Sequence, residues 1–383
     1  MPMRVADHFL QNTAQHSLGE PPHCWLGNPQ DRRQPHSPLR IAVIGVGRMG
    51  QHHVRILSRL QDVVLLGVSD LNLERGLAIA RQYQVHFFET YQDLLPHVDA
   101  AIVAVPTRQH YEVGMTCLAA GIHVLIEKPI AASVSEAEAL VQAAARSRES
   151  QPTGGQRILQ VGHVERFNPT FQALAQVLDA EKILALSAHR LSPYGDRAND
   201  VSVVLDLMIH DIDLMLALVD APVVKLTAQG RCVNQALLDD VTATLEFTNG
   251  TVATLTASKA STQKLRRLVA YGQHSLTKAD FLGHSIHVRH HGCQETGAVF
   301  RSGFERCYAE TQHDMPLYID PLYAELQHFV HCIQAKQSPA VGGVQATDAL
   351  RLAYFIEQIV LEGDQWPAPG WRSGNRRLHL NCH

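Results

Sequence analysis

The segment Gly45-Val-Gly-Arg-Met-Gly50 constrains the fold of this 383-residue chain more than any other part of the sequence. It follows the short apolar run Ile41–Ile44 and opens a segment of helical character that reaches about Leu60. At this spacing the first glycine permits a tight turn, the second lets the backbone approach a pyrophosphate, and the third lets helix and strand pack closely. The helix N-terminus offers N–H groups and partial positive charge to the phosphates. The segment predicts a dinucleotide site with cofactor-binding residues Gly45, Gly47, Arg48, Met49 and Gly50.

Asp70 indicates which dinucleotide binds. It ends the apolar run Val63–Asp70, where a carboxylate can accept hydrogen bonds from both hydroxyls of a ribose. The same carboxylate repels a 2′-phosphate, and the residues Leu71–Leu73 offer no Arg or Lys to bind one. NAD is therefore the expected cofactor. Arg75, one turn further on, leaves NADP open as an alternative.

Apolar runs alternate with amphipathic segments as far as about residue 160. The expected strands are 41–44, 63–70, 85–88, 100–105, 124–126 and 158–161, and the expected helices after Leu60 are 72–83, 91–95, 109–120 and 134–146. Continuous apolar strands separated by helices indicate a parallel sheet with helices on both faces. We expect an α/β fold, an N-terminal Rossmann domain with a doubly wound parallel sheet.

The pattern changes after about residue 150, where longer alternating strands replace the strand–helix repeat. Strands are expected from 183 onward and at 242–247, 251–258, 265–271, 274–279 and 285–290, with helices at 203–219, 321–335 and 346–361. Thr248-Asn-Gly250 joins two of these strands, and Asn-Gly suits a type I′ hairpin turn. We expect a C-terminal α+β domain with an open antiparallel sheet. The expected domains are an NAD-binding domain at 39–160 and a substrate-binding domain at 161–363, between an extension at 1–38 and a tail at 364–383.

Composition excludes several classes of partner. With 33 Lys and Arg against 37 Asp and Glu, the net charge of −4 lacks the basic footprint of nucleic-acid binding. No run approaches about 18 consecutive apolar residues, so we expect no membrane contact. The seven scattered cysteines form no Cys-x-x-Cys pair, and residues 1–38 contain no apolar signal segment, so the expected location is the cytoplasm. Residues 1–38 are either a disordered extension or the result of a start codon placed upstream of the true one.

Glu127-Lys128-Pro129 follows the predicted strand 124–126. Loops at the carboxyl ends of parallel strands line the ligand crevice, so Lys128 can lie near the nicotinamide and hydrogen-bond a substrate hydroxyl. For acid–base work its pKa would have to be lowered by burial or by neighbouring cations.

A second polar group lies in the predicted helix 203–219. Asp206 and His210 are four residues apart, which on an α-helix places both on one face. A carboxylate there can orient the imidazole, which can then exchange a proton with a hydroxyl. A zinc site would need a third clustered ligand, which the familiar spacings do not supply. Because apolar residues surround both side chains, we interpret them as catalytic.

A histidine-rich segment near the end of the predicted sheet resembles a metal cluster. On an alternating strand, however, His287, Arg289 and His291 share one face while His284 and His290 face the other way. A solvated strand face explains this arrangement more simply than zinc, and we expect no bound metal.

Taken together, the glycine turn, Glu-Lys-Pro and Asp-x-x-x-His resemble the Gfo/Idh/MocA family of oxidoreductases over about Leu39–Gly363. The resemblance implies that Lys128, Asp206 and His210 surround the sugar carbon that loses or gains hydride. Val105–His110 is similar to the segment that lies beside the cofactor in that family. The further cofactor-binding residues expected on this basis are Pro106, Thr107, His110, Glu127 and Lys128.

Two segments, Gly162–Pro169 and Leu205–Asp213, most resemble family members that oxidise the 3-hydroxyl of UDP-N-acetylglucosamine, a step toward the 3-amino sugar of certain lipid A molecules. Similar segments occur in inositol and other sugar dehydrogenases, which remain the alternative. Arginine forks match phosphate oxygens, so arginines are candidates for the diphosphate. The expected substrate-binding residues are Lys128, His163, Arg166, Asn168, Arg190, Arg197, Asp206 and His210.

The expected partners are a nucleotide sugar, a downstream aminotransferase, and further copies of the chain. An open apolar sheet face has to be covered, which favours a homodimer or homotetramer. A noncatalytic NAD-binding regulator is the other class of function considered. Such a protein could dispense with Lys128 or His210, and the presence of both favours an enzyme.

Overall fold

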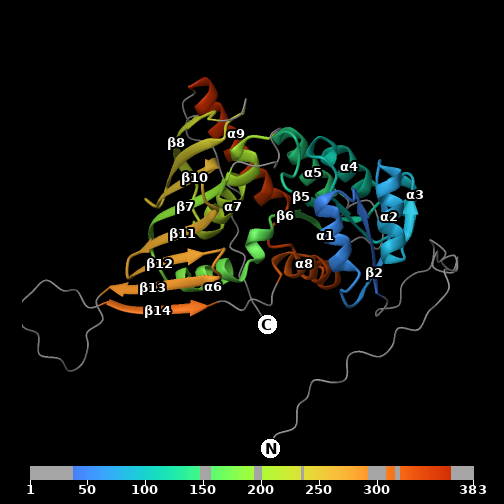
Figure 1. Ribbon diagram of the computed structural model, residues 1–383, viewed down its shortest axis with the longest axis horizontal. Helices are drawn as coiled ribbons and strands as arrows, with labels where there is room; N and C mark the ends of the chain where they lie inside the picture. The colour runs from blue at the N-terminus through green and yellow to red at the C-terminus, as the bar shows by residue number, and fades with distance from the viewer. Residues whose placement is uncertain are drawn as a thin grey trace, which may run out of the picture.

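The computed structural model describes residues 38–146, 157–193, 201–233, 237–291, 308–314 and 320–363. Two sheets lie side by side with helices between them (Figure 1). The predicted tail at 364–383 and all but the last residue of the predicted extension lie outside the described residues. Within the described ranges, none of the helices is long and apolar enough to cross a membrane.

The first sheet is parallel and has six strands in the order β3-β2-β1-β4-β5-β6, which confirms the predicted Rossmann fold. Its strands are β1 (Leu39–Ile44), β2 (Val63–Ser69), β3 (His86–Phe88), β4 (Ala100–Val103), β5 (His123–Glu127) and β6 (Leu159–Gly162). Every residue of β4 is buried, as expected for a strand covered on both faces. Because all six strands run parallel, their carboxyl ends meet at one edge of the sheet, where the candidate site lies.

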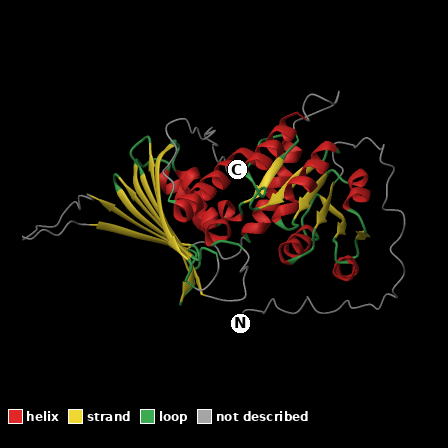
Figure 2. Ribbon diagram, turned by 90° about the horizontal axis from the view of Figure 1, so that it is seen from above, coloured by secondary structure: helices red, strands yellow, loops and turns green. Residues whose placement is uncertain are grey.

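Helices cover both faces of this sheet (Figure 2). They are α1 (Arg48–Leu57), α2 (Leu73–Tyr83), α3 (Tyr91–Leu94), α4 (His110–Ala119) and α5 (Val134–Arg146), with short 3₁₀ turns η2 (Leu95–His97) and η3 (Thr107–Gln109). A helix from the far end of the chain, α8 (Pro321–Ala335), packs against α1 and contributes Leu326 and Phe329 to the core of this sheet. The nucleotide-binding half is thus completed by the C-terminal part of the sequence.

The second sheet has eight strands in the order β14-β13-β12-β11-β7-β10-β9-β8. They are β7 (Ile183–Pro193), β8 (Val223–Arg231), β9 (Asp240–Phe247), β10 (Val252–Ser261), β11 (Leu265–Gly272), β12 (Ser275–Asp280), β13 (Ser285–His291) and β14 (Tyr308–Asp314). The sheet is mostly antiparallel, as predicted, but β7 and β10 pair in parallel because the chain crosses over between them. No described helix covers its outer face (Figure 2).

The structure also contains elements that the sequence analysis did not predict, namely β8, β14, η4 (Val164–Phe167) and α6 (Pro169–Leu178). The start of α6 carries ordinary signals, because Asn168 caps it and Pro169 occupies its first turn. The hairpin between β9 and β10 differs from the expected type I′ turn. Phe247 accepts from the N–H of Gly250 and donates to Thr251, and among the three loop residues φ is positive only at Gly250, at +84°. This is the three-residue loop in which a type I turn ends at a left-handed glycine.

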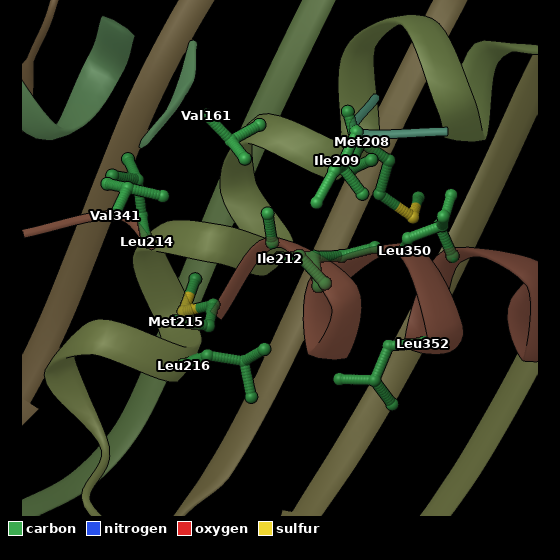
Figure 3. Close-up of a cluster of buried hydrophobic side chains, with 14 of the residues drawn as sticks. Val161, Met208, Ile209, Ile212, Leu214, Met215, Leu216, Val341, Leu350 and Leu352 are labelled. Carbon is green, nitrogen blue, oxygen red and sulfur yellow. The ribbon is translucent and has the colours of Figure 1, made fainter. Parts of the chain in front are cut away.

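A continuous apolar core joins the two halves of the molecule. The predicted helix 203–219 is divided into a π-helical segment, η5 (Val204–Met208), and α7 (Ile209–Leu218), and it packs against the last helix, α9 (Gly343–Glu362). Figure 3 shows Ile212 of α7 beside Leu350 of α9, with Met208 and Ile209 close by. Because α7 is buried on nearly every side, its acidic side chains have to find partners inside the protein.

Candidate active site

The turn between β1 and α1 has the geometry that a bound pyrophosphate needs. Gly45 has a φ of +87°, and a Cβ there would lie 2.8 Å from the backbone of Ala104. A Cβ at Gly50 would collide with the carbonyl oxygen of Gly45. At Gly47, in contrast, a Cβ would meet no described atom within 4 Å, so the backbone faces open space. Arg48 begins α1 and is exposed, and Met49 is half-buried. The turn fits NAD.

Asp70 follows β2 and accepts hydrogen bonds from the N–H groups of Val46 and Asn72, each at 2.7 Å. Arg75 donates to both carboxylate oxygens, at 3.2 and 2.7 Å. Burial alone would raise the pKa of Asp70, but these hydrogen bonds outweigh it and hold the pKa below its usual value. Asp70 is thus an anion beside the glycine turn whose oxygens already have donors within the protein, and its contact with a ribose stays a prediction.

The other expected cofactor residues lie at the ends of β4 and β5. Pro106 is exposed and Thr107 half-buried at the start of η3, while the buried His110 ring lies 2.9 Å from the carbonyl oxygen of Val105 and 2.8 Å from that of Pro129. His110 thereby links the two loops that leave these strands. Burial lowers the pKa of His110, while the contacts with the two carbonyl oxygens oppose this shift.

Glu127, at the end of β5, is held in place by a histidine of α1. Its Oε1 lies 2.7 Å from Nε2 of His53, a fully buried residue of α1. Burial would raise the pKa of Glu127, but the contact with His53 and the charge of Lys128 lower it overall. The helix that presents the glycine turn is thus connected directly to the Glu-Lys-Pro segment.

Lys128 reaches across to the second half of the molecule. Its Nζ donates to the carbonyl oxygen of Asp206 at 2.7 Å and lies 3.6 Å from Asp206 Oδ1. Burial lowers the pKa of Lys128, while Asp206 and Glu127 oppose this shift. The structure therefore brings together two of the three predicted catalytic residues, with a lysine whose pKa lies below its usual value.

The expected pairing of Asp206 with His210 does not occur. Asp206 lies in the π-helical segment η5, where i→i+5 bonding changes the angular relation between positions four apart. Its carboxylate contacts Lys128 and Lys259 instead, and His210 Nδ1 is buried with no hydrogen-bond partner among the described residues. Residues four apart share a face only on a regular α-helix, and the π-helical winding of η5 removes that relation here.

His210 lies among cations and has another histidine beside it. Its ring is edge-on to that of His163, with 6.5 Å between the ring centres. Burial, followed by the charges of Lys128 and Arg190, places the pKa of His210 well below its usual value. His163 is buried and lies 3.9 Å from Asp213 Oδ2, and burial lowers its pKa as well. Both imidazoles are therefore neutral, and His210 can accept a proton.

The arginines expected to bind a diphosphate are engaged by carboxylates of the protein. Arg190 is 2% exposed and donates to both oxygens of Asp211 and to Glu165 Oε1. Arg166 forms a bidentate pair with Asp213, at 2.6 and 3.0 Å. Asn168 caps α6 and donates to Glu165 Oε2, which gives it an internal role. Arg197 lies outside the described residues, so its role stays a prediction.

Several polar residues of this region were not predicted as part of the site, among them His53, Glu165 and Lys259. Glu165 lies within the quoted segment Gly162–Pro169, yet an isolated Glu in a sequence gives no sign that it pairs with a distant Arg. Lys259 continues the every-second-position series of Ala253, Leu255 and Ala257, so alternation along β10 places it on the buried face, but the predicted strand ended one residue before it. Within the described part of the chain, no three His, Cys, Asp or Glu side chains are grouped as metal ligands are.

Comparison with known proteins identifies the family. The model of an oxidoreductase family with an NAD-binding Rossmann fold, Gfo/Idh/MocA, matches residues 39–150, and the C-terminal domain model of the same family matches residues 180–276. The chain is 32% identical to the UDP-N-acetylglucosamine 3-dehydrogenase of Acidithiobacillus ferrooxidans, over 84% of this chain and 97% of that protein. This chain belongs to the Gfo/Idh/MocA family.

Solved structures and further relatives agree with this placement. A crystal structure of the Acidithiobacillus ferrooxidans enzyme superimposes with a TM-score of 0.75 at 31% identity, covering 84% of this chain and 98% of that chain. The myo-inositol 2-dehydrogenase of Thermotoga maritima is 24% identical over 85% of this chain and 97% of that protein. This Gfo/Idh/MocA protein is an NAD-dependent oxidoreductase acting on CH–OH groups, and the relatives named above are sugar and polyol dehydrogenases.

Proposed function

We propose that this Gfo/Idh/MocA protein oxidises the 3-hydroxyl of UDP-N-acetylglucosamine to the 3-keto sugar with NAD, and so supplies an aminotransferase that makes a 3-amino sugar for lipid A. The observation that carries the catalytic part is the contact of Lys128 with Asp206 beside the neutral His210. The support for the substrate is similarity along nearly the whole length of a relative that bears this activity in its name.

Each residue of the site has a distinct task in this reaction. NAD, when bound by the turn after β1 and by Asp70, supplies the acceptor for the hydride that leaves the sugar carbon. His210 takes the hydroxyl proton, which its neutral imidazole allows. The Lys128 ammonium donates to the same oxygen and stabilises its developing negative charge. Asp206 holds Lys128 in place through its carbonyl oxygen.

A small neutral polyol is the second candidate substrate, and the arginine pairs favour it. A diphosphate has to be matched by cations, but Arg166 and Arg190 already have carboxylate partners. Arg166 is the more accessible of the two, with 14% of its side chain exposed, and it is the arginine that could exchange Asp213 for a phosphate. An inositol would need no such exchange.

The deciding experiment measures NADH formation at 340 nm from UDP-N-acetylglucosamine, UDP-glucose, glucose and myo-inositol. A coupled aminotransferase removes the ketone, because the equilibrium opposes alcohol oxidation near neutral pH. We expect the highest kcat/KM with UDP-N-acetylglucosamine in the native protein. In Arg166→Met this preference over the other three substrates should be lost. A higher kcat/KM with the free polyol would overturn the substrate proposal and favour the second candidate.

A further inference from the structure

Lys259 of β10 is a buried cation that the reaction described so far does not use. Only 6% of its side chain is exposed, and its Nζ donates to the carbonyl oxygen of Val201 at 2.9 Å. The same Nζ lies 3.1 Å from Asp206 Oδ2. A lysine is almost never this deeply buried unless its charge is paired. Its burial therefore points to a specific relationship with Asp206.

The Asp206 carboxylate lies between two lysines from different parts of the fold. Oδ2 contacts Lys259 from β10 at 3.1 Å, and Oδ1 lies 3.6 Å from Lys128, which follows β5. The contact with Lys259 is the shorter of the two. At 3.6 Å the carboxylate is beyond hydrogen-bond distance of Lys128, which bonds to the Asp206 carbonyl oxygen instead.

The electrostatic field at Lys128 depends on how close the Asp206 carboxylate lies to Lys128 and how close it lies to Lys259. Asp206 and Glu127 stabilise the Lys128 ammonium, while Arg190 and burial destabilise it. Lys259 forms an ion pair with Asp206 Oδ2 and so keeps this oxygen on the side away from Lys128. Lys259 also adds a second positive charge on the far side of the carboxylate. Both effects work against a proton on Lys128.

We propose that Lys259 is a positioning residue that holds the Asp206 carboxylate away from Lys128, so that the Lys128 ammonium is more acidic and therefore a stronger hydrogen-bond donor to the reacting oxygen. The inference rests on the proposed catalytic role of Lys128. Its central test, however, needs no substrate, so that a failure of the proposed substrate and a failure of this inference give different results.

The test follows the acidity of Lys128 directly. Acetic anhydride acylates only the free amine, so the labelling of the Lys128 peptide against pH, read by mass spectrometry, gives the midpoint of Lys128 deprotonation. Lys259→Gln removes the charge but keeps a donor for the Val201 carbonyl, and Lys259→Arg keeps both. We expect a midpoint about one pH unit higher in Lys259→Gln, a tenfold change in acidity, and an unchanged midpoint in Lys259→Arg.

A double variant separates action through Asp206 from simple repulsion between lysines. In an Asp206→Asn background, Lys259→Gln should move the midpoint by less than half of its effect in the native background. NADH binding and thermal unfolding show whether each variant is folded. An unchanged midpoint in folded Lys259→Gln, an equal shift in Lys259→Arg, or a full shift in the Asp206→Asn background would each overturn the proposal.

Discussion

The Arg75 guanidinium donates to both carboxylate oxygens of Asp70, from Nε at 3.2 Å and from Nη2 at 2.7 Å. With the backbone N–H groups of Val46 and Asn72, four donors meet the roughly four acceptor positions of one carboxylate. A ribose diol can therefore bind Asp70 only by displacing Arg75. That side chain is 44% exposed and has room to turn toward solvent.

This pairing leads to a prediction about cofactor choice. NAD should bind more tightly than NADP, because Asp70 accepts ribose hydroxyls and repels a 2′-phosphate. Asp70→Ala should weaken NAD binding about tenfold, because the ribose loses its hydrogen bonds to a charged group. The difference in affinity between NAD and NADP should also become smaller, because Arg75 is released and can contact the 2′-phosphate. Fluorescence titration with NADH and NADPH measures both dissociation constants.

The matched variant for this prediction is Asp70→Ala combined with Arg75→Ala. If Arg75 is the group that receives the 2′-phosphate, the double variant should lose the NADPH affinity gained by the single one. Equal or tighter binding of NADP by the unaltered protein would contradict the assignment of Asp70.

The catalytic assignments predict a loss of turnover without a loss of cofactor. Lys128→Ala and His210→Ala should each lower kcat by about 10²–10⁴, because each removes a group that acts on the reacting oxygen. NAD affinity should remain within about twofold in His210→Ala. Lys278→Ala and His290→Ala, which remove exposed side chains of the second sheet, are the matched controls. Near-normal turnover in Lys128→Ala or His210→Ala would remove that residue from the mechanism.

The sequence predicted those parts of the molecule that depend on local pattern. Continuous apolar runs identified all six strands of the first sheet, and the glycine spacing located a tight turn whose backbone faces open space at Gly47. Alternation identified most of the second sheet. These predictions succeed because strand burial and turn geometry are determined by residues that are neighbours in the sequence.

What the sequence could not show depends on contacts between distant segments. Asp206 contacts Lys128 and Lys259, the latter 53 positions later in the chain (259 − 206), and not His210 on the next turn. The π-helical winding of η5 that separates Asp206 from His210 has no recognised sequence signal. Arg190 likewise gives no sign in the sequence that Glu165 and Asp211 will enclose it. Ion pairs of this kind follow from the tertiary fold.

Arg190 therefore yields a prediction about stability. Arg190→Met should lower the free energy of unfolding by about 3–5 kcal/mol, because it leaves the buried Asp211 carboxylate without its ionic partner and removes the shorter of the two arginine contacts of Glu165. In the native protein Arg190 helps to hold the pKa of Glu165 below its usual value. Without it, the carboxylate pKa values in the folded state should rise above those in the unfolded chain, so stability should be retained at low pH and lost as pH rises.

Denaturant unfolding of Arg190→Met at about pH 5 and pH 8 measures this change. The loss should be larger at the higher pH, with Arg166→Met, whose arginine side chain is more exposed than that of Arg190, as the comparison. A fully stable Arg190→Met protein that has lost only its affinity for nucleotide sugar would instead assign Arg190 to the substrate.

The outer face of the second sheet is the surface that we propose joins copies of this chain. Val252, Ala185, Tyr271 and Leu276 lie side by side in neighbouring strands, and Tyr271 is 48% exposed. Tyr271→Asp should place a charge in this row and lower the molecular mass measured by light scattering to that of a monomer. Leu361→Asp, at an exposed position on α9, is the control that should leave the mass unchanged. A monomeric native protein would contradict the proposal.

The pH dependence of oxidation should show two limbs, each displaced by the surroundings of one residue. His210 has to be neutral to take the proton, so the rate falls only below its pKa, and burial with nearby cations places that pKa well below 6.5. Lys128 has to be charged to donate, so the rate falls above its pKa, which burial lowers from 10.5. Initial rates should therefore hold as pH drops through 6.5 and decline before pH 10.5 is reached. In Lys128→Arg the residual activity should lack the alkaline limb, because the guanidinium stays charged. An acid limb centred at or above 6.5 would show that His210 does not act as a neutral base in these surroundings.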